Sequence, residues 1–329
     1  MSASRPVIVI PGDDPPQIAG SPHLERLRRH GGVVLHDTRP RDVEEQVERA
    51  REATAILNSR GQVKWPGEAL RRLPDLEMIT VCGIGTDSID LEAARELGIV
   101  VCNVPGRTAP VVAEHALALL LGVARRVAFQ TAELRAGRWT RALGTSLAGK
   151  TLGVIGTGNI GCAMIRLARA VGMNVIAWSY HPSPDKSTEL GFRYTDLERL
   201  LEESDAVSLH VQLTEESRHL IGERELSRMK PGSLLVNTAR GEVVDTRALV
   251  AALESGHLGG AGLDVFAEEP LPPDHPLLRA EQVVLTPHAA DQTPEGVDLL
   301  NEGCADNVIA YLEGSPRNVV VGSARDRRK

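Results

Sequence analysis

Residues 151–161 read TLGVIGTGNIG, a strand-like apolar run that breaks into a turn with three closely spaced glycines. Gly156, Gly158 and Gly161 form the pattern G-x-G-x-x-G, and an amphipathic helix pattern follows them. In a strand–turn–helix unit the first glycine permits the tight turn, the second lets a pyrophosphate approach the backbone, and the third lets the helix pack on the strand. The N-terminus of the helix adds free N–H groups and partial positive charge. This stretch predicts a dinucleotide-binding domain; the alternative is a glycine-rich turn that binds no ligand.

Short runs rich in valine and isoleucine alternate with helical patterns on both sides of this turn. Five such runs precede residue 105, and six lie between residues 151 and 287. They lack the polar alternation of half-exposed strands, which is typical of parallel strands buried on both faces. A long apolar helix pattern from Pro110 to Val127 separates the two series and should be buried between layers. The fold class is therefore α/β, with parallel sheets covered by helices.

Two domains are expected, because 329 residues are too many for one ordinary core. The last helical pattern has Thr293 as its N-cap, Pro294 in its first turn and Gly314 as its stop. The chain order favours a return of this helix onto the N-terminal sheet. We predict a discontinuous substrate domain of residues 1–104 and 291–320, an inserted dinucleotide-binding domain of residues 105–290, and a disordered tail of residues 321–329.

Charge and cysteine content limit the partners and the compartment. The net charge of −7 argues against nucleic acid or an anionic membrane surface as the main partner. No apolar run is long enough to span a bilayer, and no signal peptide is visible. The four cysteines have no CxxC spacing, so we expect buried thiols in the reducing cytoplasm and no metal site. They are Cys82, Cys102, Cys162 and Cys304.

Three chemically useful residue types follow strands of the second series. Arg240 comes after SLLVNT, the pair Glu268 and Glu269 comes after AGLDVF, and His288 comes after VVLTP. Ligands of open parallel sheets bind beyond the carboxyl ends of the strands. Taken singly, each has a simpler interpretation: Arg240 as a salt-bridge partner, at least one of the two glutamates as a solvated loop charge, and His288 as a core histidine.

Together they supply the three groups that hydride transfer to a keto acid requires. A guanidinium binds the substrate carboxylate in bidentate fashion. An imidazole donates a proton to the carbonyl oxygen, which becomes negative as the hydride arrives. A carboxylate raises the pKa of the imidazole and fixes its orientation. The residues alone do not decide which of the two glutamates acts.

The position expected to bind the ribose hydroxyls of the cofactor lacks the usual acidic residue. NAD-binding domains carry Asp or Glu about 20 residues after the glycines, whereas this chain has Ser179. A serine does not repel the 2′-phosphate of NADP, and His181 and Lys186 would attract it. The cofactor is therefore NAD or NADP, with the choice left open.

Six stretches, in one order, resemble the D-isomer-specific 2-hydroxyacid dehydrogenase family and cover most of the chain. They are VCGIGTDSIDLEAARELGIVVCNVPG, VAEHALALLL, TLGVIGTGNIG, MKPGSLLVNTARGEVVDTRALVAAL, GLDVFAEEP and LTPHAA. The resemblance implies a flavodoxin-like substrate domain built from both chain ends, an inserted Rossmann domain, and a homodimer. It also implies an NAD(P)-dependent dehydrogenase that reversibly reduces a small 2-keto acid to a D-2-hydroxy acid.

The resemblance also implies residue roles. Arg240 would bind and polarise the substrate, His288 would be the general acid–base, and Glu269 would be the carboxylate partner of the histidine. Asp264 would hold the nicotinamide amide. With Ser179 at the ribose, the expected cofactor contacts are Gly156, Gly158, Asn159, Ile160, Gly161, Thr238, Ala239 and Ala290, and the expected substrate contacts are Ile84, Gly85 and Asn58.

Two other classes share parts of this pattern. A nicotinamide-sensing binding module of the corepressor type would bind the cofactor without turnover. Relatives of formate dehydrogenase resemble the pattern but use glutamine at the position of Glu269. The complete set of arginine, glutamate and histidine favours the 2-hydroxyacid dehydrogenase over both. The sequence does not identify the acid, for which Asn58, Arg60 and Trp139 are candidate pocket residues.

Overall fold

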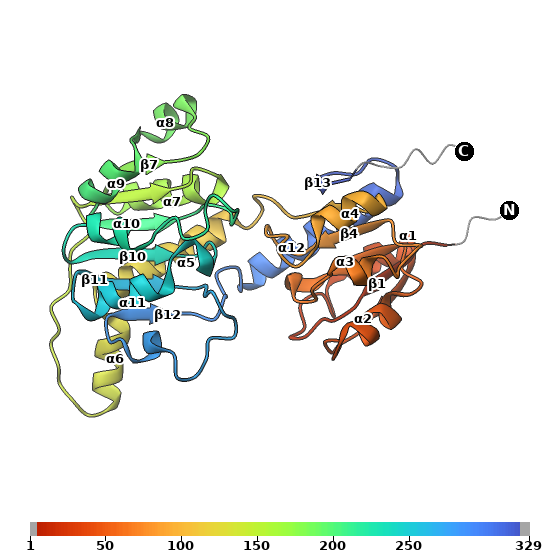
Figure 1. Cartoon of the computed structure of the whole chain (residues 1–329), viewed down its shortest axis with the longest axis horizontal. Helices are drawn as coiled ribbons and strands as arrows, with labels where there is room; N and C mark the ends of the chain where they lie inside the picture. Colours follow the sequence, from red (N-terminus) through yellow and green to blue (C-terminus); the bar gives the residue numbers. More distant parts are fainter. Residues whose placement is uncertain (1–4, 323–329) are drawn as a thin grey trace. The chain divides into compact units, whose positions relative to one another are not determined.

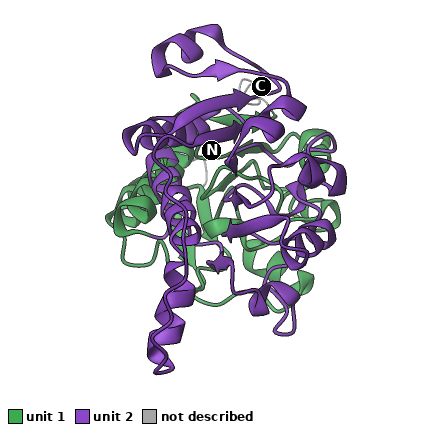
Figure 2. Cartoon of the chain, turned by 90° about the vertical axis from the view of Figure 1, so that its left-hand side faces the viewer, with its two compact units in different colours: residues 1–108, 293–329 green, residues 109–292 purple. Residues whose placement is uncertain are grey.

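Two sheets, one of six strands and one of seven, organise the chain in this computed structural model, which describes residues 5–322. Each sheet belongs to its own unit (Figure 2). Unit 1 consists of residues 1–108 and 293–329, and unit 2 consists of residues 109–292. The predicted domain limits, 104/105 and 290/291, differ from these limits by four and two residues. The functions assigned to the two domains from the sequence stay predictions.

The sheet of unit 1 has the strand order β13-β5-β4-β3-β1-β2. Its five N-terminal strands are parallel, and their order, 2-1-3-4-5, is flavodoxin-like. All residues of β3 and β4 are buried, as expected for parallel strands that helices cover on both faces. Helices α2, α3 and α4 share one apolar core with the sheet, and α1 and α12 share the other. The bounds are β1 Val7–Ile10, α1 Pro22–His30, β2 Gly32–Leu35, α2 Val43–Ala50, β3 Ala55–Asn58, α3 Gly67–Leu70, β4 Met78–Val81, α4 Leu91–Leu97, β5 Val100–Cys102, α12 Pro294–Leu312 and β13 Val319–Val321.

Strand β13 is not predicted from the sequence. It pairs antiparallel with β5, and the side chain of Val321 is buried at 5% exposure. The assignment of residue 321 to a disordered tail is therefore wrong, because its apolar side chain completes the core at the edge of the sheet. Residues 323–329 of the predicted tail lie outside the described residues.

Helix α12 returns to the N-terminal sheet as predicted. Thr293 caps it, because its side chain accepts a hydrogen bond from the N–H of Gly296 at 3.0 Å. Gly314 follows its C-terminus with a φ of +81°, a left-handed conformation that suits a helix stop. The predicted cap, first-turn proline and stop are therefore confirmed.

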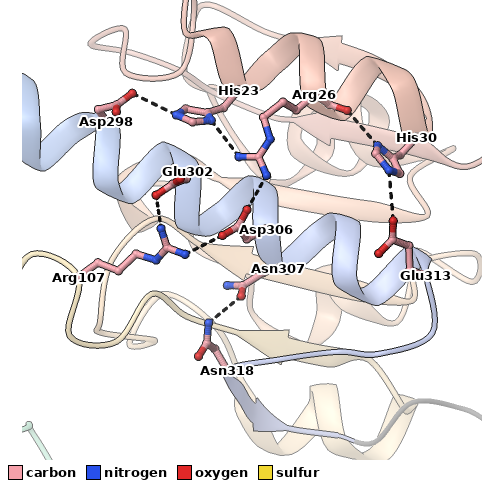
Figure 3. Close-up of polar contacts among 10 residues, drawn as sticks. All are labelled: His23, Arg26, His30, Arg107, Asp298, Glu302, Asp306, Asn307, Glu313 and Asn318. Carbon is pink, nitrogen blue, oxygen red and sulfur yellow. Dashed lines mark hydrogen bonds and ion pairs between the residues drawn. The ribbon is translucent and has the colours of Figure 1, made fainter.

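Ion pairs fasten α12 inside unit 1 (Figure 3). Asp306 lies 2.6 Å from Arg26 of α1 and 2.6 Å from Arg107, which follows β5. Arg107 also pairs with Glu302, one helical turn before Asp306. The last long helix is thereby tied to the first helix and to the segment that leaves β5.

The sheet of unit 2 has the strand order β12-β11-β10-β9-β6-β7-β8, and every pair is parallel. Counted from β6, this is the Rossmann order 3-2-1-4-5-6 with one added strand. Helices α5 and α7 cover one face, and α9, α10 and α11 cover the other. The two-residue strand β8 is not predicted from the sequence. The bounds are α5 Ala109–Ala124, α6 Val127–Arg135, β6 Thr151–Ile155, α7 Asn159–Ala170, β7 Asn174–Trp178, α8 Pro184–Leu190, β8 Arg193–Tyr194, α9 Leu197–Glu203, β9 Ala206–Leu209, α10 Glu223–Arg228, β10 Ser233–Asn237, α11 Thr246–Glu254, β11 Leu258–Leu263 and β12 Val283–Leu285.

The long apolar helix is shorter than predicted. Helix α5 packs against α7, β10 and β11, as its composition requires, but it ends at Ala124. Arg126 has a φ of +51°, which interrupts the helix, and α6 begins after it. No residue of α6 is buried, and this helix projects from the rest of unit 2 (Figure 1). We call residues 127–143 the α6 arm; it exposes Val127, Leu134, Trp139 and Leu143.

None of the described helices has the length and apolar character that crossing a bilayer requires. The four cysteines are free and buried. Between residues 5 and 322, no group of three or more His, Cys, Asp or Glu side chains is placed to hold a metal ion. The cytoplasmic location stays a prediction.

Candidate active site

The glycine turn lies between β6 and α7. Gly156 has a φ of +98°, and a Cβ atom there would lie 2.6 Å from the carbonyl oxygen of His210. A Cβ at Gly161 would lie 1.9 Å from the carbonyl oxygen of Gly156, so both positions exclude a side chain. A Cβ at Gly158 would meet nothing within 4 Å, which leaves this backbone open to a ligand. Helix α7 begins at Asn159 without a side-chain cap, so its first N–H groups remain available for an anion.

Two buried polar atoms at neighbouring strand ends fit a ligand that carries hydroxyls and phosphates. Thr238 follows β10, is 8% exposed, and its Oγ1 has no hydrogen-bond partner among the described residues. His210 follows β9; its Nε2 lies 2.8 Å from Ser208 Oγ, and its Nδ1 has no partner within residues 5–322. Burial lowers the pKa of His210 to about 4, so this imidazole is neutral. The residues at these strand ends therefore fit a dinucleotide.

The end of β7 carries no acid, and a cation lies near the glycine turn. Ser179 follows β7, and its Oγ accepts a hydrogen bond from the N–H of His181 at 3.2 Å. Lys186, on α8, donates from Nζ to the carbonyl oxygen of Thr157 in the glycine turn, at 2.9 Å. The local charge is therefore compatible with a phosphate on the ribose.

Glu269 and His288 form an ion pair within unit 2. His288 Nδ1 lies 2.7 Å from Glu269 Oε2. The other carboxylate oxygen accepts a hydrogen bond from the N–H of Phe266 at 3.0 Å. Because an ionised carboxylate only accepts hydrogen bonds, Nδ1 carries a proton and Nε2 is left to exchange one with a substrate. The side chain of His288 is 48% exposed, so a substrate can reach it.

The charges of this pair stabilise each other. The hydrogen bond with Glu269 raises the pKa of His288 above its ordinary value, although burial and the charge of Arg240 lower it. Burial opposes the ionisation of Glu269, but the hydrogen bonds from His288 and Phe266 leave its pKa below the usual range. Since the charge of Arg240 acts on both groups, all three lie within electrostatic range.

Asp264, directly after β11, anchors the turn that carries His288. Its fully buried carboxylate accepts hydrogen bonds from the N–H groups of Ala289 at 2.8 Å and Ala290 at 3.0 Å. Its carbonyl oxygen accepts the N–H of His288 at 2.7 Å. His288 has a φ of +50°, a conformation that costs a non-glycine residue on the order of 1–3 kcal/mol and needs such support. Asp264 therefore fixes the backbone from which the imidazole projects.

Arg240 follows β10 in a loop that Asn237 and Gly241 define. Asn237 donates from Nδ2 to the carbonyl oxygen of Arg240 at 2.8 Å, and its Oδ1 accepts the N–H of Ala239 at 2.9 Å. A Cβ at Gly241 would lie 1.9 Å from the carbonyl carbon of Phe266, so the loop packs directly on the Phe266 backbone. Because the N–H of Phe266 binds the Glu269 carboxylate, this close approach links the loop of Arg240 to the Glu269–His288 pair.

The residues of unit 1 that are predicted to contact the substrate differ in how accessible they are to a ligand. Ile84 and Gly85 follow β4 in a half-buried loop, where the side chain of Asn103 binds the carbonyl oxygen of Ile84 at 2.8 Å. Asn58 is fully buried, and its Nδ2 donates to Val63 O at 2.9 Å and to Ser88 Oγ at 3.3 Å. Its side chain holds the loop together, so direct contact with a substrate is not supported by its position.

His115 and Thr286 also belong to the site, although neither is predicted from the sequence. His115 Nε2, on α5, lies 2.9 Å from Thr286 Oγ1, and this hydroxyl lies 2.6 Å from Asp264 Oδ1. The available signal is an imidazole within the apolar helix pattern VAEHALALLL, where burial requires a polar partner.

Comparison with known proteins gives consistent matches. A family model described as D-isomer specific 2-hydroxyacid dehydrogenase, NAD binding domain, matches residues 117–290. The glyoxylate reductase of Korarchaeum cryptofilum is 43% identical over 305 residues, which cover 90% of this chain and 92% of that protein. The segment matched by the family model contains Arg240, Glu269 and His288.

Two solved structures share the fold over almost the whole chain. The D-lactate dehydrogenase from Aquifex aeolicus, complexed with NAD and lactic acid, has a TM-score of 0.85 and 31% identity, covering 96% of this chain and 99% of that one. An acyclic imino acid reductase in complex with NADPH and D-Arg has a TM-score of 0.87 and 26% identity, covering 96% and 100%. Similar folds are therefore known with either nicotinamide cofactor.

Proposed function

The chain belongs to the D-isomer-specific 2-hydroxyacid dehydrogenase family, and we propose from this premise that it reduces glyoxylate and related short 2-keto acids. It is an NAD(P)-dependent enzyme that reduces 2-keto acids to D-2-hydroxy acids. The narrower substrate class is supported by its 43% identity to a protein named glyoxylate reductase. The observation that carries the proposed chemistry is the Glu269–His288 pair within electrostatic range of Arg240.

We propose the following division of the reaction among the chain's own residues. A nicotinamide cofactor, when bound, supplies the hydride that reaches the carbonyl carbon. Arg240 binds the substrate carboxylate and polarises the carbonyl group. Nε2 of His288 donates a proton to the carbonyl oxygen, so the alcohol forms without a free alkoxide. Glu269 keeps the imidazole oriented and stabilises its positive charge.

We propose that the carboxyl ends of β6, β7, β10, β11 and β12 hold the cofactor. The turn of Gly156, Gly158 and Gly161 would face the pyrophosphate, with Asn159 and Ile160 in the first turn of α7. Thr238, Ala239 and Ala290 would line the cofactor. Asp264 Oδ2 accepts one hydrogen bond, from Ala290, so it retains a lone pair for the nicotinamide amide. The substrate contacts of Ile84 and Gly85 stay predictions.

The binding-module alternative has no comparable support. None of the relatives described above is named as a corepressor, and the arginine, glutamate and histidine are all present. Glu269 also argues against the formate dehydrogenase alternative, because its carboxylate binds the imidazole.

A substrate panel tests the proposed function. Glyoxylate, hydroxypyruvate, pyruvate and phenylpyruvate would be assayed with NADH and with NADPH by the loss of reduced-cofactor absorbance. We expect the highest kcat/KM with glyoxylate or hydroxypyruvate and a D product where a stereocentre forms. A marked preference for phenylpyruvate would refute the short-acid proposal, and the absence of turnover with all four acids would count against the 2-keto acid chemistry itself.

We propose that the ribose site accepts NADPH. The Ser179→Asp variant places a carboxylate at the end of β7, where it would repel a 2′-phosphate and accept hydrogen bonds from the ribose hydroxyls of NADH. We expect the ratio of kcat/KM with NADPH to that with NADH to fall by about 10-fold or more. The uncharged variant Ser179→Asn is the control. An unchanged ratio in the aspartate variant would show that Ser179 does not face the ribose.

We propose that a second copy of the chain covers the α6 arm, as expected for a homodimer. Trp139 is 78% exposed and Leu143 is 95% exposed, Val127 and Leu134 of the same arm are exposed too, and large apolar patches on a protein surface mark interaction sites. The Trp139→Glu and Leu143→Glu variants should convert dimer into monomer in analytical ultracentrifugation. Leu278→Glu, at a residue of unit 2 that is 49% exposed outside the arm, is the control. A monomeric wild-type protein would contradict this proposal.

A further inference from the structure

A chain of three polar groups connects helix α5 to the turn that carries His288. His115 Nε2 lies 2.9 Å from Thr286 Oγ1 and 3.5 Å from Asp264 Oδ1. Thr286 Oγ1 lies 2.6 Å from the same carboxylate oxygen. All three residues belong to unit 2, and His115 reaches the site from the helix packed against β11 and β12.

The chemistry of these groups fixes the direction of the hydrogen bonds. The ionised carboxylate of Asp264 only accepts, so the single hydroxyl proton of Thr286 points toward it. The Thr286 oxygen must then accept from His115, which places a proton on Nε2. The order is therefore imidazole N–H to hydroxyl oxygen, and hydroxyl O–H to carboxylate. Removal of the hydroxyl breaks both links, whereas Thr286→Ser preserves them.

Asp264 depends on this chain to remain both ionised and oriented. Its carboxylate is fully buried, and burial raises the pKa of a carboxyl group. The nearby imidazole of His115 and the hydrogen bonds from Thr286 and Ala289 outweigh burial and leave the pKa of Asp264 below its usual range. The same carboxylate binds the N–H groups of Ala289 and Ala290, which follow His288.

We propose that His115 is a positioning residue that acts through Thr286 and Asp264 on the backbone of His288. The inference rests on the proposed roles of Asp264 and His288, and it adds His115 of α5 to the residues that position the catalytic histidine. His115 does not touch the reacting atoms. It holds the Asp264 carboxylate in the rotamer that anchors the N–H groups of Ala289 and Ala290 and leaves Oδ2 toward the nicotinamide amide.

The test compares variants that break the chain with variants that preserve it. Thr286→Val keeps the shape of the side chain and removes the hydroxyl, and His115→Leu removes the imidazole. Thr286→Ser is the conservative rescue. His257→Leu is the matched control, because it removes another half-buried histidine of unit 2, whose Nε2 lies 3.0 Å from the carbonyl oxygen of Leu226.

Two measurements separate positioning from general stability. We expect Thr286→Val and His115→Leu to lower kcat by about 10–100-fold with little change in KM for the keto acid. They should also accelerate the hydrogen exchange of the Ala289 and Ala290 amides. Thr286→Ser and His257→Leu should leave both quantities near those of the wild-type enzyme. If His115→Leu and Thr286→Val keep wild-type kcat and amide protection, or match His257→Leu in both, the proposal is wrong.

The exchange measurement also keeps this proposal distinct from the proposed function. If the wild-type enzyme turned over none of the 2-keto acids, the proposed function would fail in the wild-type assay itself. The protection of Ala289 and Ala290 would still report whether His115 fixes the Asp264 anchor, because that readout needs no turnover. Faster exchange of these two amides in Thr286→Val and His115→Leu, but not in Thr286→Ser or His257→Leu, would support the positioning role.

Discussion

Replacement of His288 by glutamine is expected to lower kcat for 2-keto acid reduction by about 10³-fold. Glutamine retains an N–H that can bind Glu269, but its amide cannot transfer a proton at neutral pH. The affinity for the cofactor should be nearly unchanged, because the glycine turn and Thr238 lie at other strand ends. Steady-state kinetics and fluorescence titration with NADH and NADPH measure the two effects.

The chain offers a matched control for this substitution in unit 1. His30 Nε2 lies 3.5 Å from Glu313 Oε1, so it also pairs an imidazole with a glutamate (Figure 3). His30→Gln should leave kcat unchanged. Near-full activity of His288→Gln on every accepted keto acid would assign the proton transfer to another group.

The pH dependence follows from the same pair. Reduction requires the protonated imidazole, so reductase activity should be present below the pKa of His288 and fall as pH rises through it. Since the hydrogen bond with Glu269 raises that pKa, Glu269→Gln should move the fall in kcat to lower pH. The pH profile of the Glu269→Gln enzyme would lie on top of the wild-type profile if the two residues were not coupled.

Replacement of Arg240 by alanine is expected to lower kcat/KM for the keto acid by about 10²–10³-fold or more. The substrate carboxylate would lose its charged partner, and the carbonyl group would lose a nearby positive charge. Arg240→Lys should recover little of this, because an ammonium cannot match the planar, bidentate geometry of a guanidinium. Steady-state kinetics over a wide range of keto acid concentration would divide the loss between KM and kcat.

Arg247 provides the corresponding control. It lies seven residues further along the chain, on α11, and is exposed. Arg247→Ala should leave kcat/KM unchanged, and Arg240→Ala should keep its affinity for the cofactor. Activity of Arg240→Ala close to that of Arg247→Ala would remove the guanidinium from the proposed mechanism.

The order of elements could be predicted because local patterns and sheet rules agree in this chain. The buried strands of both units are continuous apolar runs, and the glycine turn, the Thr293 cap and the Gly314 stop are local signals. Strand β8, with two residues, is too short to show such a pattern, and β13 pairs antiparallel outside the alternation of strands and helices. The break at Arg126 depends on a left-handed residue that local propensity does not favour.

The catalytic candidates could be identified because parallel strands end at one edge, so Arg240, Glu269 and His288 were expected to lie near one another. The choice of Glu269 over Glu268 depended on family resemblance, and the hydrogen bond to His288 agrees with it. His115 could not be assigned, because its role depends on a contact across 171 positions with Thr286. Asn58 illustrates the reverse case, since all the hydrogen bonds of this buried polar side chain go to the neighbouring residues Val63 and Ser88.

The discontinuity of unit 1 has a consequence for biosynthesis. The core shared by β1, β3 and β5 is completed by α12, which follows the whole of unit 2 in the chain. At about 5–20 residues per second, a ribosome needs about 10–40 s to make the intervening residues 109–292. During that interval the nascent N-terminal sheet lacks the helix that covers one of its faces. We therefore expect unit 2 to fold first during translation, and the N-terminal segment to be the part that most needs chaperone protection.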